Sequence, residues 1–526
     1  MKKVLQLALS PEEAYNKTLF EERVLKSAAI SDSSETYIKP LKRSIDARSK
    51  NIKVNVQVEV FSGGERPDVT TSAFNYQDVA RQPAAIVVGS GPAGLFAALR
   101  LIELGIKPIV LERGADVRAR RRDLADINKH HIVNPESNYC FGEGGAGTYS
   151  DGKLYTRSKK RGDLTRILEI FVAHGATDEI LVEAHPHIGT NKLPKIVMNL
   201  RESILQAGGE VHFNTKVTDL ILREDEIKGV ITEKGEKIEG LGVILATGHS
   251  ARDIFELLQR KKVAVEAKPF ALGVRIEHQQ SLIDQMQYHC ADRGPYLPAS
   301  SYSLVQQVLH KGIARGVFSF CMCPGGFVVP AATAPGEVVV NGMSPSRRDS
   351  KYANSGMVVA IELDDLKDYH HHGALAGMYF QKEIEQKACM AGGGTQVAPA
   401  QKMQDFVQRK VSSSLLETSY QPGLSSVDMY QVLPDMVALR LQQAFQTFGQ
   451  KMKGYLTNDA QIIGVESRTS SPVKIPRDKL TLEHVHVKRL YPCGEGAGYA
   501  GGIISAAMDG ERCAEQLKER YFKKSV

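Results

Sequence analysis

The amino-acid sequence predicts an α/β fold with a Rossmann-type parallel sheet built from discontinuous segments, a mixed α/β cap domain and a small N-terminal α/β domain. Residues 84–114 read as strand, glycine turn, helix and an uninterrupted apolar strand, as in a parallel βαβ unit. After a long insertion, residues 486–526 return to the same strand, glycine turn and helix. Residues 3–61 form a separate strand, helix and alternating strand.

Length and composition indicate a globular protein of several domains. With 526 residues the chain exceeds the size at which a single core stops growing, and 42% hydrophobic with 24% charged residues is close to globular averages. The net charge of +7 is small for a nucleic-acid-binding protein of this length, so there is no strong nucleic-acid signal, but it suits an anionic small-molecule ligand.

The sequence also favours a cytoplasmic location without a membrane anchor. The opening MKKVLQLALS has an apolar stretch too short for a signal peptide, and no run approaches the eighteen or so apolar residues that cross a bilayer. Seven scattered cysteines do not resemble a secreted disulfide framework, so we expect reduced thiols. The oligomeric state is not predicted.

The N-terminal domain is assigned to residues 1–80. It comprises a strand over Lys3–Leu9, a helix over Pro11–Ala29, a basic segment and an alternating strand over residues 51–61. Glycine, proline and polar residues from Gly63 to Pro83 are typical of a linker.

The nucleotide-binding domain is assigned to residues 81–268 and 471–526, with the cap or substrate domain at 269–470 between them. The first part contains a helix over 197–207, a strand over 208–217, a small β-meander around Gly229 and Gly235, and an apolar strand over 241–248. The cap mixes strands at 271–278, 327–332 and 337–343 with helices at 373–392 and 431–452.

The first motif with chemical meaning is the turn Gly89-Ser-Gly91-Pro-Ala-Gly94, which follows a buried-type strand and opens a helix. Gly89 permits the sharp turn, Gly91 lets the backbone approach a pyrophosphate, and Gly94 lets helix and strand pack closely. The helix N-terminus faces the negative charge. This context predicts a dinucleotide site.

Glu112 ends the second strand, 23 residues after Gly89, where a carboxylate can accept hydrogen bonds from a ribose diol. The alternative is a glycine turn in an ordinary α/β domain with a surface glutamate. The turn and Glu112 together leave open whether the dinucleotide is NAD or FAD.

Three further segments resemble the glutathione-reductase-type class of flavoproteins. They are VILATG at 243–248, the glycine-rich NYCFGEGGAGTYSDGK at 138–153, and LYPCGEGAGYAGG at 490–502. With LERG, ATGHSARD, LKRSIDARSK, LGVRIEH and FCMCPGG, the set resembles the FAD-dependent dehydrogenase-like family of predicted NAD(FAD)-utilising dehydrogenases along nearly the whole chain.

The resemblance implies FAD as the cofactor and assigns roles to these segments. The 246–248 turn would lie near the FAD phosphates and ribose, the 144–148 loop along the isoalloxazine, and Glu495 at the ribityl hydroxyls, where the class more often has Asp. The full set of implied cofactor contacts is Gly89, Ser90, Gly91, Pro92, Ala93, Gly94, Glu112, Arg113, Gly144, Gly145, Ala146, Gly147, Thr148, Val217, Ala246, Thr247, Gly248, Gly494, Glu495, Gly501, Gly502 and Ile503.

The expected function is that of an FAD-dependent oxidoreductase, a dehydrogenase or reductase of unknown small-molecule substrate that transfers a hydride at a non-covalent flavin. Because no second GxGxxG follows an apolar strand, NAD(P)H would bind elsewhere as a transient reductant. The alternatives are a flavin-dependent RNA-modifying enzyme and an FAD-binding sensor or interaction protein without turnover.

Cys321, Cys323 and Arg275 are the candidate catalytic residues. Two thiols two residues apart could relay electrons with a flavin, but in an extended strand their Cα atoms would lie about 6.6 Å apart, at the far end of disulfide reach. Cys323, beside a Pro-Gly-Gly turn, is the stronger candidate; both could instead be small packed hydrophobes. Arg275 could meet an anionic substrate or pair within the cap.

The remaining charged clusters are interpreted as surface. Arg118, Arg120, Arg121 and Arg122, and the RSKKR run at 157–161, are expected to be solvated, with phosphate contact as the alternative. The adjacent His370, His371 and His372 do not share one face as metal ligands would, so no metal is predicted.

Overall fold

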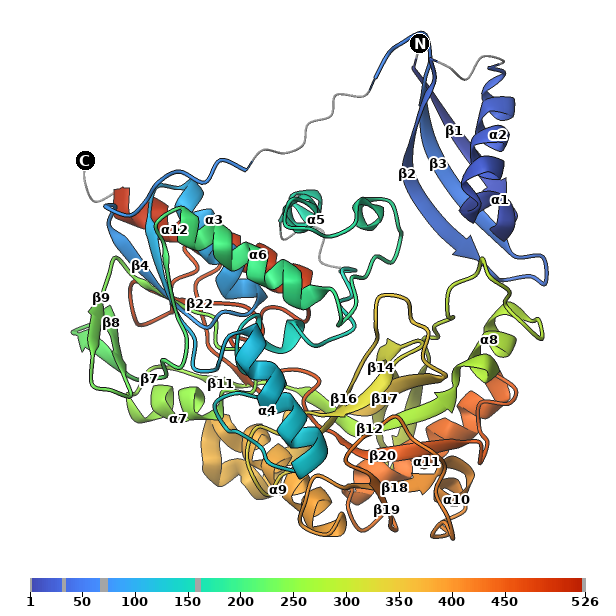
Figure 1. Ribbon diagram of the computed structural model, residues 1–526. Coiled ribbons are helices and arrows are strands. Elements are labelled where there is room, and N and C mark those ends of the chain that lie inside the picture. The colour runs from blue at the N-terminus through green and yellow to red at the C-terminus, as the bar shows by residue number, and fades with distance from the viewer. Residues whose placement is uncertain (1, 31–34, 67–73, 157–161, 523–526) are drawn as a thin grey trace.

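The computed structural model describes residues 2–30, 35–66, 74–156 and 162–522. The RSKKR cluster at 157–161 therefore lies outside the described residues, as does part of the predicted linker. Figure 1 shows a small N-terminal unit standing apart from a larger body, in which a parallel sheet and a large mixed sheet lie next to each other.

The N-terminal unit is a three-stranded antiparallel sheet in the order β1-β3-β2, covered by two helices. Its core combines alternate residues of β3, the valines at 54, 56, 58 and 60, with Leu9, Ala14, Val24 and Ala28 of β1 and the helices. The elements are β1 Lys2–Leu9, α1 Pro11–Tyr15, α2 Lys17–Ala28, β2 Tyr37–Asp46 and β3 Lys53–Phe61.

Two expectations for this unit were wrong. The helix predicted over Pro11–Ala29 is interrupted, because the Asn16 side chain accepts from the backbone N–H groups of Thr18 and Leu19 and starts a second helix. The basic segment contains β2, whose register shift between Pro40 and Lys42 weakens the alternation of its side chains.

The parallel Rossmann-type sheet has the strand order β22-β10-β4-β5-β6, so its last strand in sequence completes one edge beside strands made more than 240 residues earlier. Helices α3, α5, α6 and α12 cover one face, and the β7-β8-β9 meander with α7 covers the other. The bounds are β4 Ala84–Val88, α3 Pro92–Glu103, β5 Lys107–Leu111, α5 Leu164–Ala173, α6 Leu193–Gln206, β6 Glu210–His212, β7 Val217–Arg223, β8 Glu226–Thr232, β9 Lys237–Glu239, β10 Val243–Leu245, α7 Arg252–Arg260, β22 Leu490–Pro492 and α12 Ile503–Phe522.

The cap is a seven-stranded mixed sheet in the order β13-β14-β17-β12-β20-β18-β19, with α8 to α11 packed around it. Its central strand β12 is buried along nearly its whole length, and α11 supplies apolar residues to the same core. The bounds are β12 Phe270–Gln279, α8 Gln280–Tyr288, β13 Val305–His310, β14 Ile313–Cys323, β17 Tyr352–Ile361, α9 Ala376–Ala391, β18 Ala398–Lys402, α10 Met403–Val407, β19 Leu424–Ser426, α11 Asp435–Lys451 and β20 Ala460–Glu466.

Short elements join the two sheets. The hairpin of β15 Phe327–Pro330 and β16 Val340–Met343 packs on α4 Val117–His130, and β11 Glu266–Ala267 pairs with β21 Val473–Lys474 where the chain enters and leaves the cap. The 3-10 helices are η1 Gly145–Gly147, η3 Asp178–Leu181 and η4 Leu363–Leu375. No helix among the described residues is long and apolar enough to span a membrane.

Candidate functional site

The carboxyl ends of β4, β10 and β22 meet at one edge of the parallel sheet and form the floor of a cavity of about 410 Å³. Open α/β sheets bind ligands at this edge. The cap closes the cavity from the opposite side with residues of β14, the β15–β16 hairpin and the turn after β20. The site therefore lies between two domains, as expected for a substrate-binding interface.

The phosphate loop has the close packing that its glycines were expected to allow. A Cβ on Gly94 would lie 1.9 Å from the Gly89 carbonyl oxygen, and one on Gly89, where φ is +101°, would lie 2.4 Å from the Ala246 oxygen. Any side chain at either position would push α3 or β10 away. Gly91 caps α3 without a side-chain hydrogen bond, so the helix N-terminus stays free toward the cavity.

The second glycine loop packs on the first. A Cβ on Gly145, where φ is +59°, would meet the Gly91 Cα at 3.1 Å, so the two backbones are in contact. Gly501 and Gly502, which also line the cavity, face open space, because a Cβ added to either would have no atom within 4 Å. Backbone from three segments far apart in the sequence thus borders one cavity, as in a dinucleotide site.

Most of the expected cofactor contacts form the cavity wall. The expected contacts that line it are Gly89, Gly91, Pro92, Ala93, Glu112, Arg113, Gly145, Ala146, Gly147, Val217, Ala246, Thr247, Gly248, Glu495, Gly501, Gly502 and Ile503. Ser90, Gly94, Gly144, Thr148 and Gly494 do not; they lie behind the wall and hold it in shape.

Glu112 lies on the wall, but its carboxylate already accepts four hydrogen bonds within the protein. Ser90 donates from its backbone N–H and hydroxyl at 2.9 and 2.8 Å, and the backbone N–H groups of Gly114 and Gly142 donate at 2.9 and 3.0 Å. Glu112 therefore ties both glycine loops to β5. A ribose hydroxyl would have to share these acceptor positions.

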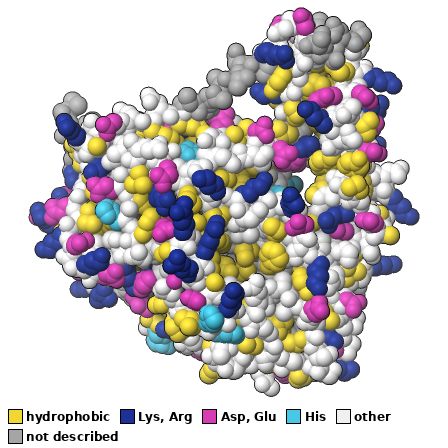
Figure 2. Space-filling view, viewed as in Figure 1, with side chains coloured by type: hydrophobic (Ala, Val, Ile, Leu, Met, Phe, Trp, Pro, Cys, Tyr) yellow, Lys and Arg dark blue, Asp and Glu magenta, His cyan; other side chains and the backbone are white. Residues whose placement is uncertain are grey.

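Two arginines near the glycine loops, one expected as a cofactor contact and one expected at the surface, have structural partners. Arg113 lines the cavity while it pairs with Glu136 and Asp253 at 2.7 and 2.8 Å. Arg120, expected on the surface, is fully buried, because its guanidinium donates to the carbonyls of Asn138, Tyr139 and Glu143 and so fixes the second glycine loop. Its neighbours Arg118, Arg121 and Arg122 are exposed, as expected. Figure 2 shows several Lys and Arg side chains gathered on the face of the larger body that is turned to the viewer.

Arg275 does not reach the cavity, so the expected substrate contact is not met. Its side chain is fully buried and pairs with Glu466 at 2.7 Å, and it also donates to Asn354 and to the Cys321 carbonyl. These contacts agree with the alternative expectation, that Arg275 pairs with residues of the cap. Arg275 fixes the backbone under Cys321 instead of facing a ligand.

The two cysteines lie at different depths, and the preference for Cys323 is not supported. Cys321 lines the cavity, whereas Cys323 is fully buried behind it. The extended spacing assumed from the sequence does not apply, because β14 bulges here: Cys321 has φ +46°, and its register against β17 shifts between Phe320 and Cys323. The bulge turns Cys321 toward the cavity.

Sequence reasoning missed Lys153 and His249, which also line the cavity. Lys153 Nζ lies 3.8 Å from the Cys321 sulfur and 3.4 Å from Asp151, and its pKa is raised by these negative partners despite burial. Lys153 is the last residue of the second glycine segment and His249 directly follows the Ala-Thr-Gly turn, but neither was given a role. Position at the end of a glycine motif was the signal available.

Glu495 and His249 face each other with 3.7 Å between Oε2 and Nε2. Burial, together with the charge of Cys321, raises the pKa of Glu495 to about 7. Burial and the nearby Arg468 and Lys268 lower the pKa of His249 to about 4. At neutral pH the imidazole is therefore neutral, so the contact is not a full ion pair, and Glu495 is partly protonated.

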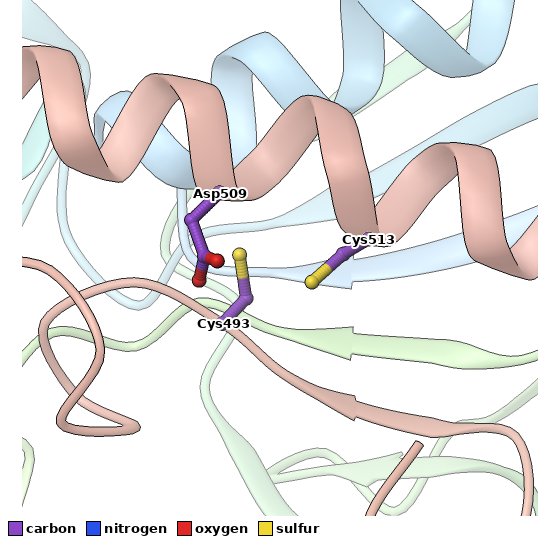
Figure 3. Close-up of side chains that lie close together, drawn as sticks. All are labelled: Cys493, Asp509 and Cys513. Atoms are coloured by element: carbon purple, nitrogen blue, oxygen red, sulfur yellow. The ribbon is translucent and has the colours of Figure 1, made fainter. Parts of the chain in front are cut away.

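A separate group of Cys493, Asp509 and Cys513 lies beneath this end of the sheet, with ligand atoms within 4.8 Å of one another (Figure 3). Asp509 is held by Arg477 at 2.6 and 2.9 Å and by the backbone N–H of Gly494 at 2.8 Å. Arg477 also lies 3.6 Å from the Cys513 sulfur. The positively charged Arg477 guanidinium lies where a metal cation would have to bind. We therefore interpret the three side chains as a structural group that holds the Gly494 turn in place.

Comparison with known proteins places the chain among flavoproteins. Three family models match: "FAD-dependent protein, C-terminal domain-like" over residues 269–469, "FAD dependent oxidoreductase" over 185–308, and a "Domain of unknown function (DUF8436)" over 1–61. A protein of Clostridium beijerinckii named "Uncharacterized protein" is 41% identical over 522 residues, which is 96% of each chain.

Other proteins share much lower sequence identity with this chain. The thiamine thiazole synthase of Methanococcus vannielii is 26% identical over 218 residues, 38% of this chain and 65% of that protein. Among solved structures, CtdE in complex with FAD matches with a TM-score of 0.31 and 13% identity over 85% of this chain and 90% of that one. A flavoprotein/dehydrogenase from Cytophaga hutchinsonii matches with a TM-score of 0.35 and 10% identity over 84% and 79%.

The two flavin-related family models agree with the cavity described above. The chain belongs to the FAD-dependent oxidoreductase family, with an FAD-dependent C-terminal domain.

Proposed function

We propose that the protein is an FAD-dependent dehydrogenase or reductase that transfers a hydride between a small molecule under the cap and a non-covalently bound flavin. The observation that carries the proposal is the continuity of the cavity from the phosphate loop at Gly89 to Glu495 and Cys321. Bound FAD would supply the hydride chemistry there, accepting or delivering two electrons and a proton.

The residues that would hold FAD come from three segments. The free N-terminus of α3 and the Gly91 backbone suit the pyrophosphate, and Glu112 and Val217 border the adenosine end. Gly501 and Gly502, which face open space, leave room for the flavin end beside the N-terminus of α12. The fit therefore depends on glycine backbone that leaves the neighbouring space free of side chains.

At that end the chain provides groups that hold protons. With a pKa of about 7, Glu495 is able to give or take a proton near neutral pH. Neutral His249 beside it accepts or donates one hydrogen bond without adding charge. From the cap, Phe320, Val329 and Ala331 add apolar surface to the cavity wall, which would help to displace water when a ligand is bound.

The test is the visible absorption spectrum of the purified protein, followed by anaerobic titration with NADH and with NADPH. We expect a flavin spectrum, with FAD released intact by denaturation because no covalent bond is formed, and bleaching by one of the two nicotinamides. A colourless protein that does not take up added FAD would overturn the proposal. A flavin that neither nicotinamide bleaches would exclude NAD(P)H as the reductant and leave another donor.

A further inference from the structure

Cys321, Cys323 and Lys153 form a compact cluster that hydride transfer at a flavin does not require. The Lys153 ammonium lies 3.8 Å from one sulfur and 3.9 Å from the other, and it also donates to the Met322 carbonyl between them. One ammonium group therefore lies close to both sulfur atoms. A pair of merely packed cysteines would not need a lysine ammonium directed at both of them.

The backbone of the cluster is held in an uncommon conformation. The bulge leaves Cys321 at φ +46°, and the Cys321 carbonyl accepts from Arg275 at 3.3 Å and from the Cys323 thiol at 3.2 Å. Through this bulge Cys321 faces the cavity while Cys323 remains buried behind it. An accessible thiol backed by a buried thiol is the arrangement of an exchanging and a resolving cysteine.

The electrostatics separate the two thiols. The neighbouring Cys323 side chain, then the charges of Lys153 and Arg275, lower the pKa of Cys321 well below its ordinary value against the effect of burial. The neighbouring Cys321 side chain, with burial, raises the pKa of Cys323. The thiolate is the reactive form of cysteine, so Cys321 is prepared as the nucleophile. The titratable groups around the pair are Lys153, Arg275, Asp151, Glu466 and Glu495.

We propose that Cys321 and Cys323 are a redox-active dithiol that exchanges an electron pair with the flavin, as a second redox centre in the same cavity. This inference rests on the proposed function. In the step, the Cys321 thiolate and the Cys323 thiol form one S–S bond, and the Cys323 S–H bond breaks. The two electrons and the one proton released pass to the bound flavin, which balances its two-electron reduction.

A disulfide between residues two apart closes a small strained ring. Strained disulfides have more oxidising potentials and are the labile ones, so this bond would be readily reduced again. The substrate class that fits is accordingly a small thiol or disulfide able to exchange with Cys321 at the cavity wall.

The test compares wild type with Cys321→Ser, Cys323→Ser and a control, Cys389→Ser. Cys389 is also buried, but its thiol donates only to the Thr395 carbonyl and it has no cationic partner among its described contacts. Each protein is oxidised with ferricyanide, which leaves no adduct on a thiol, freed of it, and titrated anaerobically with dithionite. We expect wild type and the Cys389 variant to take up about twice as many electrons per flavin as the other two.

A second measurement does not depend on flavin. After the same oxidation, the peptide containing residues 321 and 323 is expected to be lighter by two hydrogens and to resist alkylation until dithiothreitol is added. Equal electron uptake in all four proteins, or two alkylatable thiols after oxidation, would overturn the dithiol. A protein without flavin would fail the proposed function, while this mass measurement would still decide whether the two thiols form the bond.

Discussion

Glu495 is the residue whose titration the structure predicts most directly. Its pKa of about 7 in the folded protein lies above its ordinary value of 4.5, so the folded state binds more protons between these values. Stability therefore falls as the pH rises through this window and levels off above pH 7. The group destabilises the flavin-free protein at neutral and alkaline pH.

We expect Glu495→Gln to be more stable than wild type above pH 7 and equal to it below about pH 4. A shift of this size corresponds to about 3 kcal/mol, and because the side chain keeps 29% exposure we expect about 1 to 2 kcal/mol. Denaturant unfolding of the flavin-free proteins at pH 4, 6 and 8 measures it. A difference that is constant with pH would contradict the raised pKa.

Arg275 and Glu466 form a fully buried ion pair beneath the cysteine bulge. We expect Arg275→Met to cost about 3 to 5 kcal/mol of unfolding free energy, because it leaves the Glu466 carboxylate buried without its partner. Arg275→Met combined with Glu466→Leu should cost less than the single change. Denaturant unfolding of both variants checks the order, and a double variant at least as unstable as the single one would contradict it.

At the scale of elements, two glycines distinguish what the fold requires from what FAD binding requires. We expect Gly94→Ala to destabilise the protein, because its Cβ would lie 1.9 Å from the Gly89 carbonyl and force α3 away from the loop. Gly501→Ala should leave stability unchanged, since its Cβ meets nothing within 4 Å, but should weaken FAD binding. Thermal melting and FAD titration of each variant distinguish the effects; a Gly501 variant with unchanged affinity would place the flavin elsewhere.

The elements that the sequence predicted well are those whose signal is local. The βαβ unit at 84–114 combines an apolar strand, a glycine turn and a helix, and the observed β4, α3 and β5 follow it closely. Helix α11 likewise lies within its predicted range. The β14 bulge could not be foreseen, because the register shift depends on pairing with β17, which is distant in sequence. Cys323 was preferred for its position beside the Pro-Gly-Gly turn, whereas the bulge brings Cys321 to the cavity wall.

At the scale of the molecule, the fold contains long-range contacts that no sequence motif predicts. Arg120 appears in the sequence as one of four basic residues, yet it is the one whose guanidinium holds a glycine loop 18 to 23 residues away. The parallel sheet built from discontinuous segments was predicted, whereas its strand order and the burial of Arg120 and Arg275 required the packed structure. Charged residues in a basic or alternating run give no sequence sign of which one is buried.

The cavity wall is shared by the nucleotide domain and the cap but not by residues 2–61. Bound FAD should therefore slow local opening in both walls, at 89–94 and at 320–342, because a ligand that binds only the folded state stabilises it by about 2.7 kcal/mol at a hundredfold excess over Kd. The N-terminal unit contacts the body through pairs such as Arg43–Glu183, and serves as an internal control.

Hydrogen–deuterium exchange with and without FAD measures this. We expect protection of both wall segments, no change in β1 to β3, and loss of the protection in Gly501→Val, whose larger side chain would enter the space left open beside α12. Protection confined to the nucleotide domain would mean that the cap does not close on the flavin. Protection that extends into the N-terminal unit would mean that this unit also responds to the ligand, through contacts such as Arg43 with Glu183.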